Sequence, residues 1–290
     1  MSVPTSFAHT CPDPDFFVRS VPDDQTFPAR RDTLSASSEV FRDMFCCCSD
    51  TDKSMDLHEN ATTTGALLAL IHRPPSQSVI SHQSDPANGL LPKVIHDPAT
   101  VIPLPILPSL FALADKYSLS ETITQSLREH LLAHAPNDPL RVYGLAVSFN
   151  LTSIASKASQ YLQPLASYSS HQIKAIPTVD AYHRVAQLQD FRVKSLRQIL
   201  LEEDIFPHGY GSCASHREAT ISVWQEMRMT LALKVDTLTD VAGEMESIAN
   251  LPPVKDCSAC RKACIAPVDM LRYKCRKVPR ETERLSLGHS

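Results

Sequence analysis

The chain has 290 residues, 43% of them hydrophobic and 21% charged, and this composition is that of a folded protein rather than a disordered one. Its length predicts roughly two domains at ~150 residues each. Seven glycines beside 22 prolines argue against a glycine-rich nucleotide-binding fold, and no run approaches the ~20 apolar residues of a membrane-spanning helix. The formal net charge of −4 disfavours non-specific binding to nucleic acid.

The chain has nine cysteines, and their oxidation state depends on the cellular compartment of the protein. No secretory signal is visible near the first of them, Cys11. We therefore expect an intracellular protein of the cytoplasm, the nucleus or both, in which the cysteines are reduced thiols or metal ligands.

Residues 1–11 are rich in polar residues and prolines, and we expect a flexible lead-in there. The stretch from 15 to 45 then predicts a short hairpin followed by one amphipathic helix. Turn residues at 21–24 separate two short strands, and Pro28 is expected to interrupt the second strand. Ser35 or Ser38 is placed to cap the helix, whose apolar spacing is carried by Leu34, Phe41, Met44 and Phe45.

Further elements follow up to about residue 165. We expect a third strand at 55–59 with Leu57 facing inward, and then an apolar helix at 66–71. Residues 75–103 lack a sustained period and predict an extended loop of a length that is uncommon in compact domains. Helices are expected at 104–117, at 119–131 and from Asp138-Pro139 onward.

The opening stretch resembles the start of a BTB/POZ domain. In that family an Asp begins the first strand, and a Phe leads into L-x-x-x-S-x-x-F-x-x-M-F; Arg30 stands where a His is usual. Residues 114–117 and 139–143 are similar to segments of fungal members, so the resemblance covers about residues 12–165. The matching residues of the opening stretch are Asp15, Phe27, Arg31, Leu34, Ser38, Phe41, Met44 and Phe45.

The resemblance implies an α+β fold in which residues 12–136 form a small sheet flanked by helices. An all-α extension at 137–204 and a C-terminal helical region at 205–290 follow. It also implies a non-enzymatic role in protein–protein interaction, as a partner-recruiting adaptor or as a homodimer formed through the first helix and the N-terminal strand. Some BTB/POZ proteins recruit ubiquitin ligases and others act in transcription, and no residue here chooses between these partners.

A long helix is expected from Thr178, its N-cap, to Glu203. The carboxylates of Glu202 and Glu203 are interpreted as a solvated helix end. The residues of its expected buried stripe are Val179, Tyr182, Val185, Leu188, Val193, Leu196 and Leu200.

Two pairs of soft donors carry the only recognisable chemistry of the sequence, Cys213-x2-His216 and Cys257-x2-Cys260. Each spacing lets one tight turn aim two ligands at a single ion, and four nitrogen and sulfur donors form a closed tetrahedral zinc site. A straight helix across the forty intervening residues would hold the pairs ~60 Å apart. A predicted reversal at 235–237, followed by a capping box at Thr237-x-x-Asp240, brings the second pair back.

Other ligand sets compete with this one. Cys264 and Cys275 could join Cys257 and Cys260 in a cysteine-only site, Cys264 or His208 could replace one ligand, or the thiols could bind no metal. Residues 255–284 carry nine Lys or Arg and four Asp or Glu, a balance of +5 that leaves −9 for the rest of the chain. An alternative function is therefore a zinc-containing nucleic-acid or chromatin regulator that uses a basic tail within 205–290.

Overall fold

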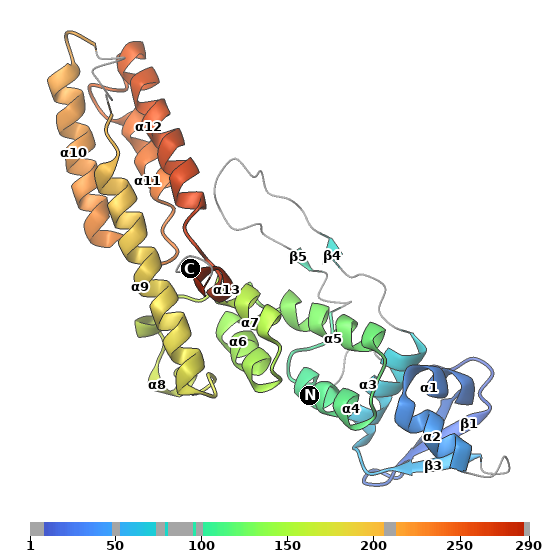
Figure 1. The fold of residues 1–290 in the computed structure, drawn as a ribbon. Coiled ribbons are helices and arrows are strands. Elements are labelled where there is room, and N and C mark those ends of the chain that lie inside the picture. The colour runs from blue at the N-terminus through green and yellow to red at the C-terminus, as the bar shows by residue number, and fades with distance from the viewer. Residues whose placement is uncertain are drawn as a thin grey trace. The chain divides into compact units, whose positions relative to one another are not determined.

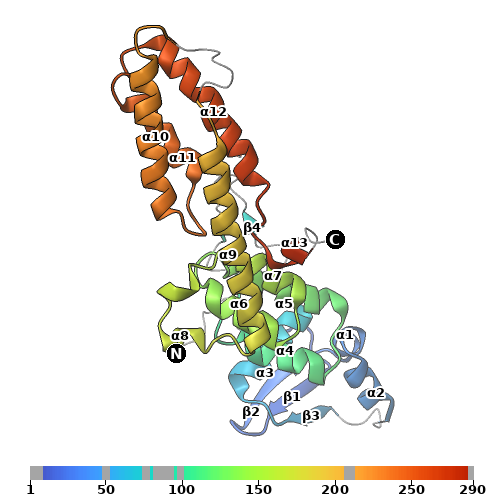
Figure 2. The same cartoon turned by 60° about the vertical axis from the view of Figure 1, so that its left-hand side comes forward.

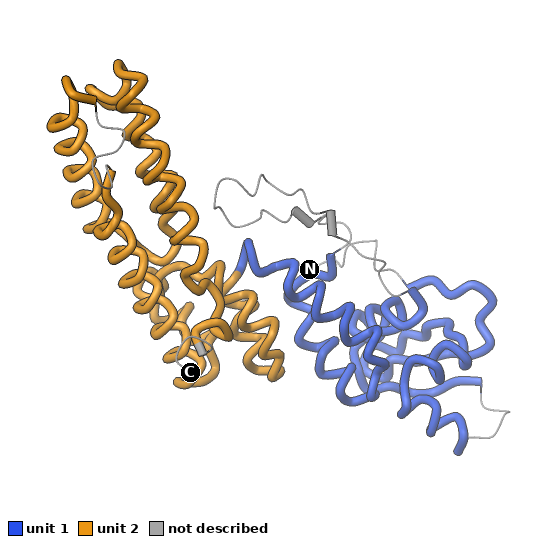
Figure 3. Tube along the Cα trace, turned by 45° about the horizontal axis from the view of Figure 1, so that its top comes forward, with its two compact units in different colours: residues 1–82, 94–138 blue, residues 83–93, 139–290 orange. Residues whose placement is uncertain are grey.

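The structure is a computed structural model that describes residues 9–47, 53–73, 79–80, 95–96, 101–205 and 213–286. The chain forms two compact units, the first from residues 1–82 and 94–138 and the second from residues 83–93 and 139–290 (Figure 3). The expectation of an α+β fold with a small sheet flanked by helices is met in unit 1, while unit 2 is built of helices.

A three-stranded sheet organises unit 1. It consists of β1 (Phe16–Ser20), β2 (Gln25–Ala29) and β3 (Ser54–Leu57) in the order β2-β1-β3, with β2 antiparallel and β3 parallel to β1. The prediction that Pro28 interrupts the second strand was wrong, because β2 continues through it to Ala29. An edge strand tolerates proline, since one of its sides has no neighbour to which an N–H must donate.

The expected single helix after the hairpin is two helices, α1 (Arg31–Ser37) and α2 (Glu39–Cys47). Ser38 separates them because it forms an isolated bridge with Leu119 and donates its hydroxyl to the carbonyl of Tyr117. The same hydroxyl accepts the N–H of Phe41 at 3.1 Å and so caps α2. Ser38 is therefore the capping serine of the two that the sequence offered.

The other residues of the BTB/POZ-like pattern make local contacts in unit 1. The Arg31 guanidinium lies 5.1 Å from the ring centroids of both Phe16 and Phe45, within the range of cation–π attraction. The carboxylate of Asp15 accepts the N–H of Arg31 at 2.9 Å and ties the start of β1 to the start of α1. These contacts explain why Asp15, Arg31 and Phe45 recur at fixed separations in the pattern: their side chains or backbone groups meet in the fold.

Three further helices complete unit 1, namely α3 (Ala61–His72), α4 (Leu107–Lys116) and α5 (Glu121–Ala133). Asn60 caps α3 by accepting the N–H of Thr63 at 2.8 Å. Of the expected lead-in, residues 1–8 lie outside the described residues, whereas His9 packs against His72 with ring centroids 4.9 Å apart.

Most of the expected loop at 75–103 lies outside the described residues. The described part contains a two-residue antiparallel pair, β4 (Val79–Ile80) and β5 (Ile95–His96). These two short strands depart from the expected loop, whereas Val101 and Ile102 have no regular structure, as expected there. Both residues are buried, and His130 and His134 hydrogen-bond the backbone of Ile102.

Unit 2 begins with short helices and continues with long ones. The short elements are α6 (Pro139–Ser148), α7 (Thr152–Ser159), η3 (Leu165–Ser167) and α8 (Ser170–Ile173). The long helices α9 (Val179–Glu202), α10 (Arg217–Lys234) and α12 (Ser258–Arg276) lie side by side (Figure 1 and Figure 2). Shorter pieces join or follow them: α11 (Val241–Glu246), η5 (Ser247–Asn250) and α13 (Thr282–Ser286).

Helix α9 is capped by Thr178, as expected, through the N–H of Ala181 at 3.1 Å. Val179 and Tyr182 are 85% and 40% exposed, so their assignment to the buried stripe was wrong. Both lie in the first turn, on the flank of the stripe. The residues that form the stripe are Ala181, Val185, Leu188, Arg192, Leu196 and Leu200.

One apolar cluster joins α9 to the helices that follow it. Leu196 and Leu200 pack with Trp224, Met245 and Leu271. The C-terminal helices thus share a core with α9.

Two polar expectations for unit 2 are met only in part. Glu202 is exposed, as expected of a solvated helix end. Glu203 is buried rather than solvated, because its carboxylate pairs with Lys274 at 2.6 Å and its carbonyl accepts the indole N–H of Trp224. The expected basic tail is largely the helix α12, in which Arg272 pairs with Glu246 at 3.0 Å. Within the described residues, no helix is both long enough and apolar enough to cross a membrane.

A buried arginine that the sequence did not single out holds the end of α12. The guanidinium of Arg192 donates to the carbonyls of Thr237, Val278 and Pro279 at 2.6, 3.2 and 3.4 Å. Burial lowers the pKa of Arg192 to about 10. This side chain joins α9 to the loop after α10 and to the segment after α12.

We expect the substitution Arg192→Met to lower the free energy of unfolding of unit 2 by about 2–4 kcal/mol, because two buried carbonyls and one partly buried carbonyl lose their donor. Urea unfolding followed by the fluorescence of Trp224, the one tryptophan of the chain, measures the change. The control is Arg184→Met on the same helix, whose exposed ion pair with Asp180 contributes no more than about 1 kcal/mol. Equal losses in the two variants would contradict this role for Arg192.

Candidate metal centre

The two predicted ligand pairs lie at the starts of two helices. Cys213 and His216 form the turn that leads into α10, where the N–H of His216 donates to the carbonyl of Cys213 at 3.2 Å. Cys257 is the N-cap residue of α12, and Cys260 lies in the first turn of that helix. Each pair therefore projects from one tight turn, as the x2 spacing predicts.

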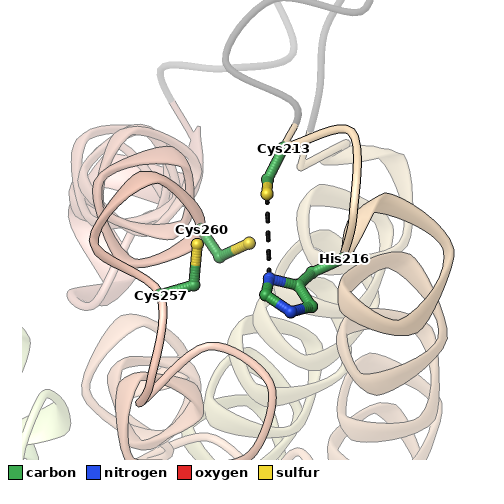
Figure 4. Close-up of side chains that lie close together, drawn as sticks. All are labelled: Cys213, His216, Cys257 and Cys260. Carbon is green, nitrogen blue, oxygen red and sulfur yellow. Dashed lines mark hydrogen bonds between the residues drawn. The ribbon is translucent and has the colours of Figure 1, made fainter.

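The structure brings all four side chains together (Figure 4). Their potential ligand atoms lie within 4.8 Å of one another, and the sulfur of Cys213 is 3.7 Å from Nδ1 of His216. In a tetrahedral site with metal–sulfur bonds of ~2.3 Å and metal–nitrogen bonds of ~2.0 Å, the ligand atoms stand ~3.5–3.8 Å apart. A small inward movement of the side chains meets that geometry, so the cluster could hold a metal ion.

The predicted chain reversal makes this convergence possible. Helix α10 ends at Lys234, and α11, η5 and residues 251–256 carry the chain back to Cys257. The predicted cap at Thr237 was wrong: the side chain of Asp240 caps α11 by accepting the N–H of Gly243 at 3.2 Å. Leu238 is 45% exposed, because it lies in the turn before α11.

Burial differs among the four ligands. Cys260 is fully buried, and the other three are half-buried. The hydroxyl of Thr220 donates to the sulfur of Cys260 at 3.4 Å, a contact that sequence reasoning missed. Its position four residues after His216, one turn further along α10, is the signal that could have found it.

The thiols at the site differ in acidity for physical reasons. The pKa of Cys257 is lowered to about 6, first by a hydrogen bond from the backbone N–H of Cys260 and then by the side chains of His216 and Cys260. Burial raises the pKa of Cys260. A thiolate is the metal-binding form of cysteine, and Cys257 reaches it most readily of the pair.

The helix dipoles also favour negative charge here. The N-termini of α10 and α12 meet at the site, and each carries a partial positive charge. Three thiolates with a divalent ion give the centre a formal charge of −1, which complements both helix ends. The ligands lie at the N-termini of α10 and α12, and this position therefore also stabilises their ionised form.

The competing ligands do not join the cluster. Cys264 and Cys275 stand 11 residues apart on α12, a distance of ~16 Å along a helix, so no single ion can bind both. Burial raises the pKa of each to about 11. His208 lies outside the described residues. Among the residues that the structure describes, this is the one group of three or more potential ligands whose donor atoms converge.

The donor set restricts what the centre can do. Four protein ligands fill a tetrahedral coordination sphere and leave no position for water or substrate. Such an arrangement suits a structural ion rather than a catalytic one.

Comparisons with known proteins assign no family to the chain. No protein-family model matches the chain, and no curated protein matches it significantly.

Proposed function

We propose that the protein is a zinc-stapled interaction protein that binds other proteins and catalyses no reaction. The observation that carries the proposal is the convergence of Cys213, His216, Cys257 and Cys260 from two helix starts into one closed site. Such a site stabilises a fold rather than presenting a metal to a substrate.

Zinc is the metal that best fits these ligands. Cysteine sulfur and imidazole nitrogen are soft or borderline donors, whereas magnesium and calcium require oxygen ligands. The cluster contains three sulfurs, one imidazole and no carboxylate. Tetrahedral sites of this composition are typical of structural zinc.

The position of the centre explains what the ion would stabilise. The residues of α10 and α12 beside the ligands are mostly exposed, including Arg217, Glu218, Arg261 and Lys262. Within the first turns of the two helices Thr220 and Cys260 are the buried side chains, and the fully buried members of the apolar cluster begin further along the helices, at Trp224 and Cys264. Metal bonds between the two helix starts would therefore replace missing hydrophobic contacts.

Unit 1 supports the interaction part of the proposal. The hairpin, the two following helices and a third strand parallel to the first form a small sheet flanked by helices, which is the arrangement that the BTB/POZ resemblance implies. Phe17 and Val21 are 41% and 37% exposed at the N-terminal hairpin. Exposed apolar side chains at this hairpin suit a BTB/POZ-type dimer or a bound partner.

We expect the purified protein to contain one zinc ion per chain, and the double substitution Cys257→Ala, Cys260→Ala to lose it. Atomic emission measures the zinc, and cobalt substitution adds thiolate-to-metal absorption bands that disappear in the same variant. The matched control is Cys264→Ala, Cys275→Ala, which removes the competing thiols of the same helix and should retain the ion. Full zinc content in the first double variant would refute the assigned ligands.

Removal of zinc by a chelator should loosen one end of unit 2 and leave unit 1 intact. Hydrogen exchange followed by mass spectrometry should show peptides from the first turns of α10 and α12 exchanging at least about tenfold faster, because local opening there is no longer opposed by metal bonds. Peptides from α3 to α5 provide the internal control. Unchanged exchange at the helix starts would show that the ion does not stabilise them.

The substitution Phe17→Asp should weaken self-association that depends on unit 1 by about tenfold or more, because a charge replaces an apolar contact. Sedimentation velocity over a range of protein concentrations measures the effect. Gln125→Asp, which adds the same charge at an exposed position of α5, is the control. An unchanged association constant for Phe17→Asp would argue against a dimer formed through this hairpin.

A further inference from the structure

The second ligand pair, Cys257 and Cys260, can do more than bind a metal, because its two sulfurs can bond to each other. Both residues belong to the start of α12, and the two residues between them are helical. Their Cα atoms therefore lie ~5 Å apart, inside the range of about 4.4–6.8 Å that a disulfide requires. The side chains lie beside each other (Figure 4), with their sulfurs within 4.8 Å. The backbone of this turn is thus compatible with a disulfide.

Neighbouring cysteines of unit 2 are less suited to this bond. The partner of Cys213 within its own turn is His216, whose imidazole cannot form a disulfide. Further along α12, burial raises the pKa of Cys264 and of Cys275 to about 11. A buried thiol of high pKa stays protonated and reacts poorly with oxidants.

A reagent that comes from solvent reaches the two sulfurs of the pair unequally. Cys257 is only half-buried, whereas Cys260 is fully buried behind it and accepts a hydrogen bond from the hydroxyl of Thr220. An accessible cysteine next to a second, less accessible one is the arrangement in which the first is oxidised and the second resolves it. The order of reaction is therefore Cys257 first and Cys260 second.

The surroundings keep the pair in its reactive form. A cysteine that binds a metal ion is deprotonated, and the thiolate is the form that reacts with peroxides. The site lies at two helix N-termini, and the exposed cations Arg217, Arg261 and Lys262 beside it outnumber the one exposed carboxylate of those turns, Glu218. An electropositive and partly exposed position is typical of cysteines that oxidants attack.

We propose that Cys257 and Cys260 form a peroxide-reactive site, at which oxidation closes a disulfide and expels the zinc ion. This inference rests on the zinc centre proposed above. The thiolate of Cys257 attacks hydrogen peroxide, so that a sulfur–oxygen bond forms, the oxygen–oxygen bond breaks and hydroxide leaves. The sulfur of Cys260 then attacks that of Cys257, the disulfide forms, the sulfur–oxygen bond breaks and a second hydroxide leaves. Two electrons thus pass from the two sulfurs to the peroxide.

The disulfide removes two of the four ligands at once. Cys213 and His216 alone cannot complete a tetrahedral site, so the ion leaves. No metal bond then joins the start of α10 to the start of α12, and this end of unit 2 opens as it would with a chelator. Unlike chelation, the change persists until a thiol reductant breaks the disulfide.

Peptide mapping identifies the disulfide directly. The zinc-loaded full chain is treated with hydrogen peroxide, and its free thiols are alkylated before digestion with trypsin. Both cysteines lie in one tryptic peptide, 256–261, so the disulfide appears as an unalkylated peptide that has lost two hydrogens. We expect this peptide to be oxidised at least about tenfold more than the peptide that contains Cys264. Equal oxidation of the two peptides, or a disulfide that joins Cys213 to either cysteine, would overturn the proposal.

The variant Cys260→His tests the order of the two thiols. It keeps a nitrogen donor at the fourth ligand position but removes the thiol that resolves oxidised Cys257. Dimedone, a reagent that traps sulfenic acids, should then label Cys257 at least about tenfold more than in the parent, in which the disulfide forms instead. Equal labelling of Cys257 in the two proteins would contradict the resolving role of Cys260.

Zinc release connects the disulfide to the metal centre. A chromogenic chelator measures the released ion during oxidation, and we expect one zinc for each disulfide that forms. Dithiothreitol with added zinc should restore the thiols and the bound ion. The control Cys264→Ala, Cys275→Ala should release zinc at a rate within about twofold of the parent, because it removes thiols outside the ligand cluster. Zinc that stays bound after the disulfide has formed would overturn the proposal.

The zinc content before oxidation separates this inference from the function on which it rests. A protein that carries no zinc would refute the metal centre and the peroxide-reactive site together. A protein that carries zinc, and that keeps both the ion and the two thiols in peroxide, would refute the peroxide-reactive site alone.

Discussion

The reversal of the chain after α10 is the constraint on which the rest of unit 2 depends. Forty residues separate His216 from Cys257, and the four candidate ligands meet only because the chain returns along the length of the helix that it has just formed. Polar groups lie at both ends of this path. The ligand cluster lies at the starts of α10 and α12, and the buried guanidinium of Arg192 lies at their other ends. An apolar cluster that includes Trp224 and Leu271 fills the space between them.

The sequence predicts the ligand cluster but not the buried role of Arg192. The ligand pairs are local patterns, and the two ligands of one tight turn must point to one side whatever the rest of the chain does. Arg192 occupies a position of the apolar stripe of α9, where a charged residue looks like an interruption. Its partners are backbone carbonyls 45 and 86 residues further along the chain. No local sequence pattern identifies a distant carbonyl that will accept a hydrogen bond. The same reasoning explains Glu203, whose burial depends on Lys274, 71 residues away.

Unit 1 shows a similar division between local and distant causes. The hairpin strands, the inward Leu57 and the apolar faces of α4 and α5 follow from periodicity, and the structure confirms them. The break at Ser38 and the continuation of β2 through Pro28 do not follow from it. The first depends on the distant backbone at Tyr117 and Leu119, and the second depends on β2 lying at the edge of the sheet. Sequence periodicity predicts which side of an element is buried better than it predicts where the element ends.

The candidate metal centre is physically linked to a groove that lies far from it along α10. The groove is lined by Val223, Met227 and Thr230 of α10 on one side and by Leu251 and Pro252 on the other. Thr230 lies 14 residues after His216 on one helix, ~21 Å along its axis, so the ligand cluster cannot touch the groove directly. Leu251 and Pro252 begin the segment that ends at Cys257. A metal bond to Cys257 would restrain that segment at its far end, and the proposed ion would thereby fix the distance between the two walls of the groove.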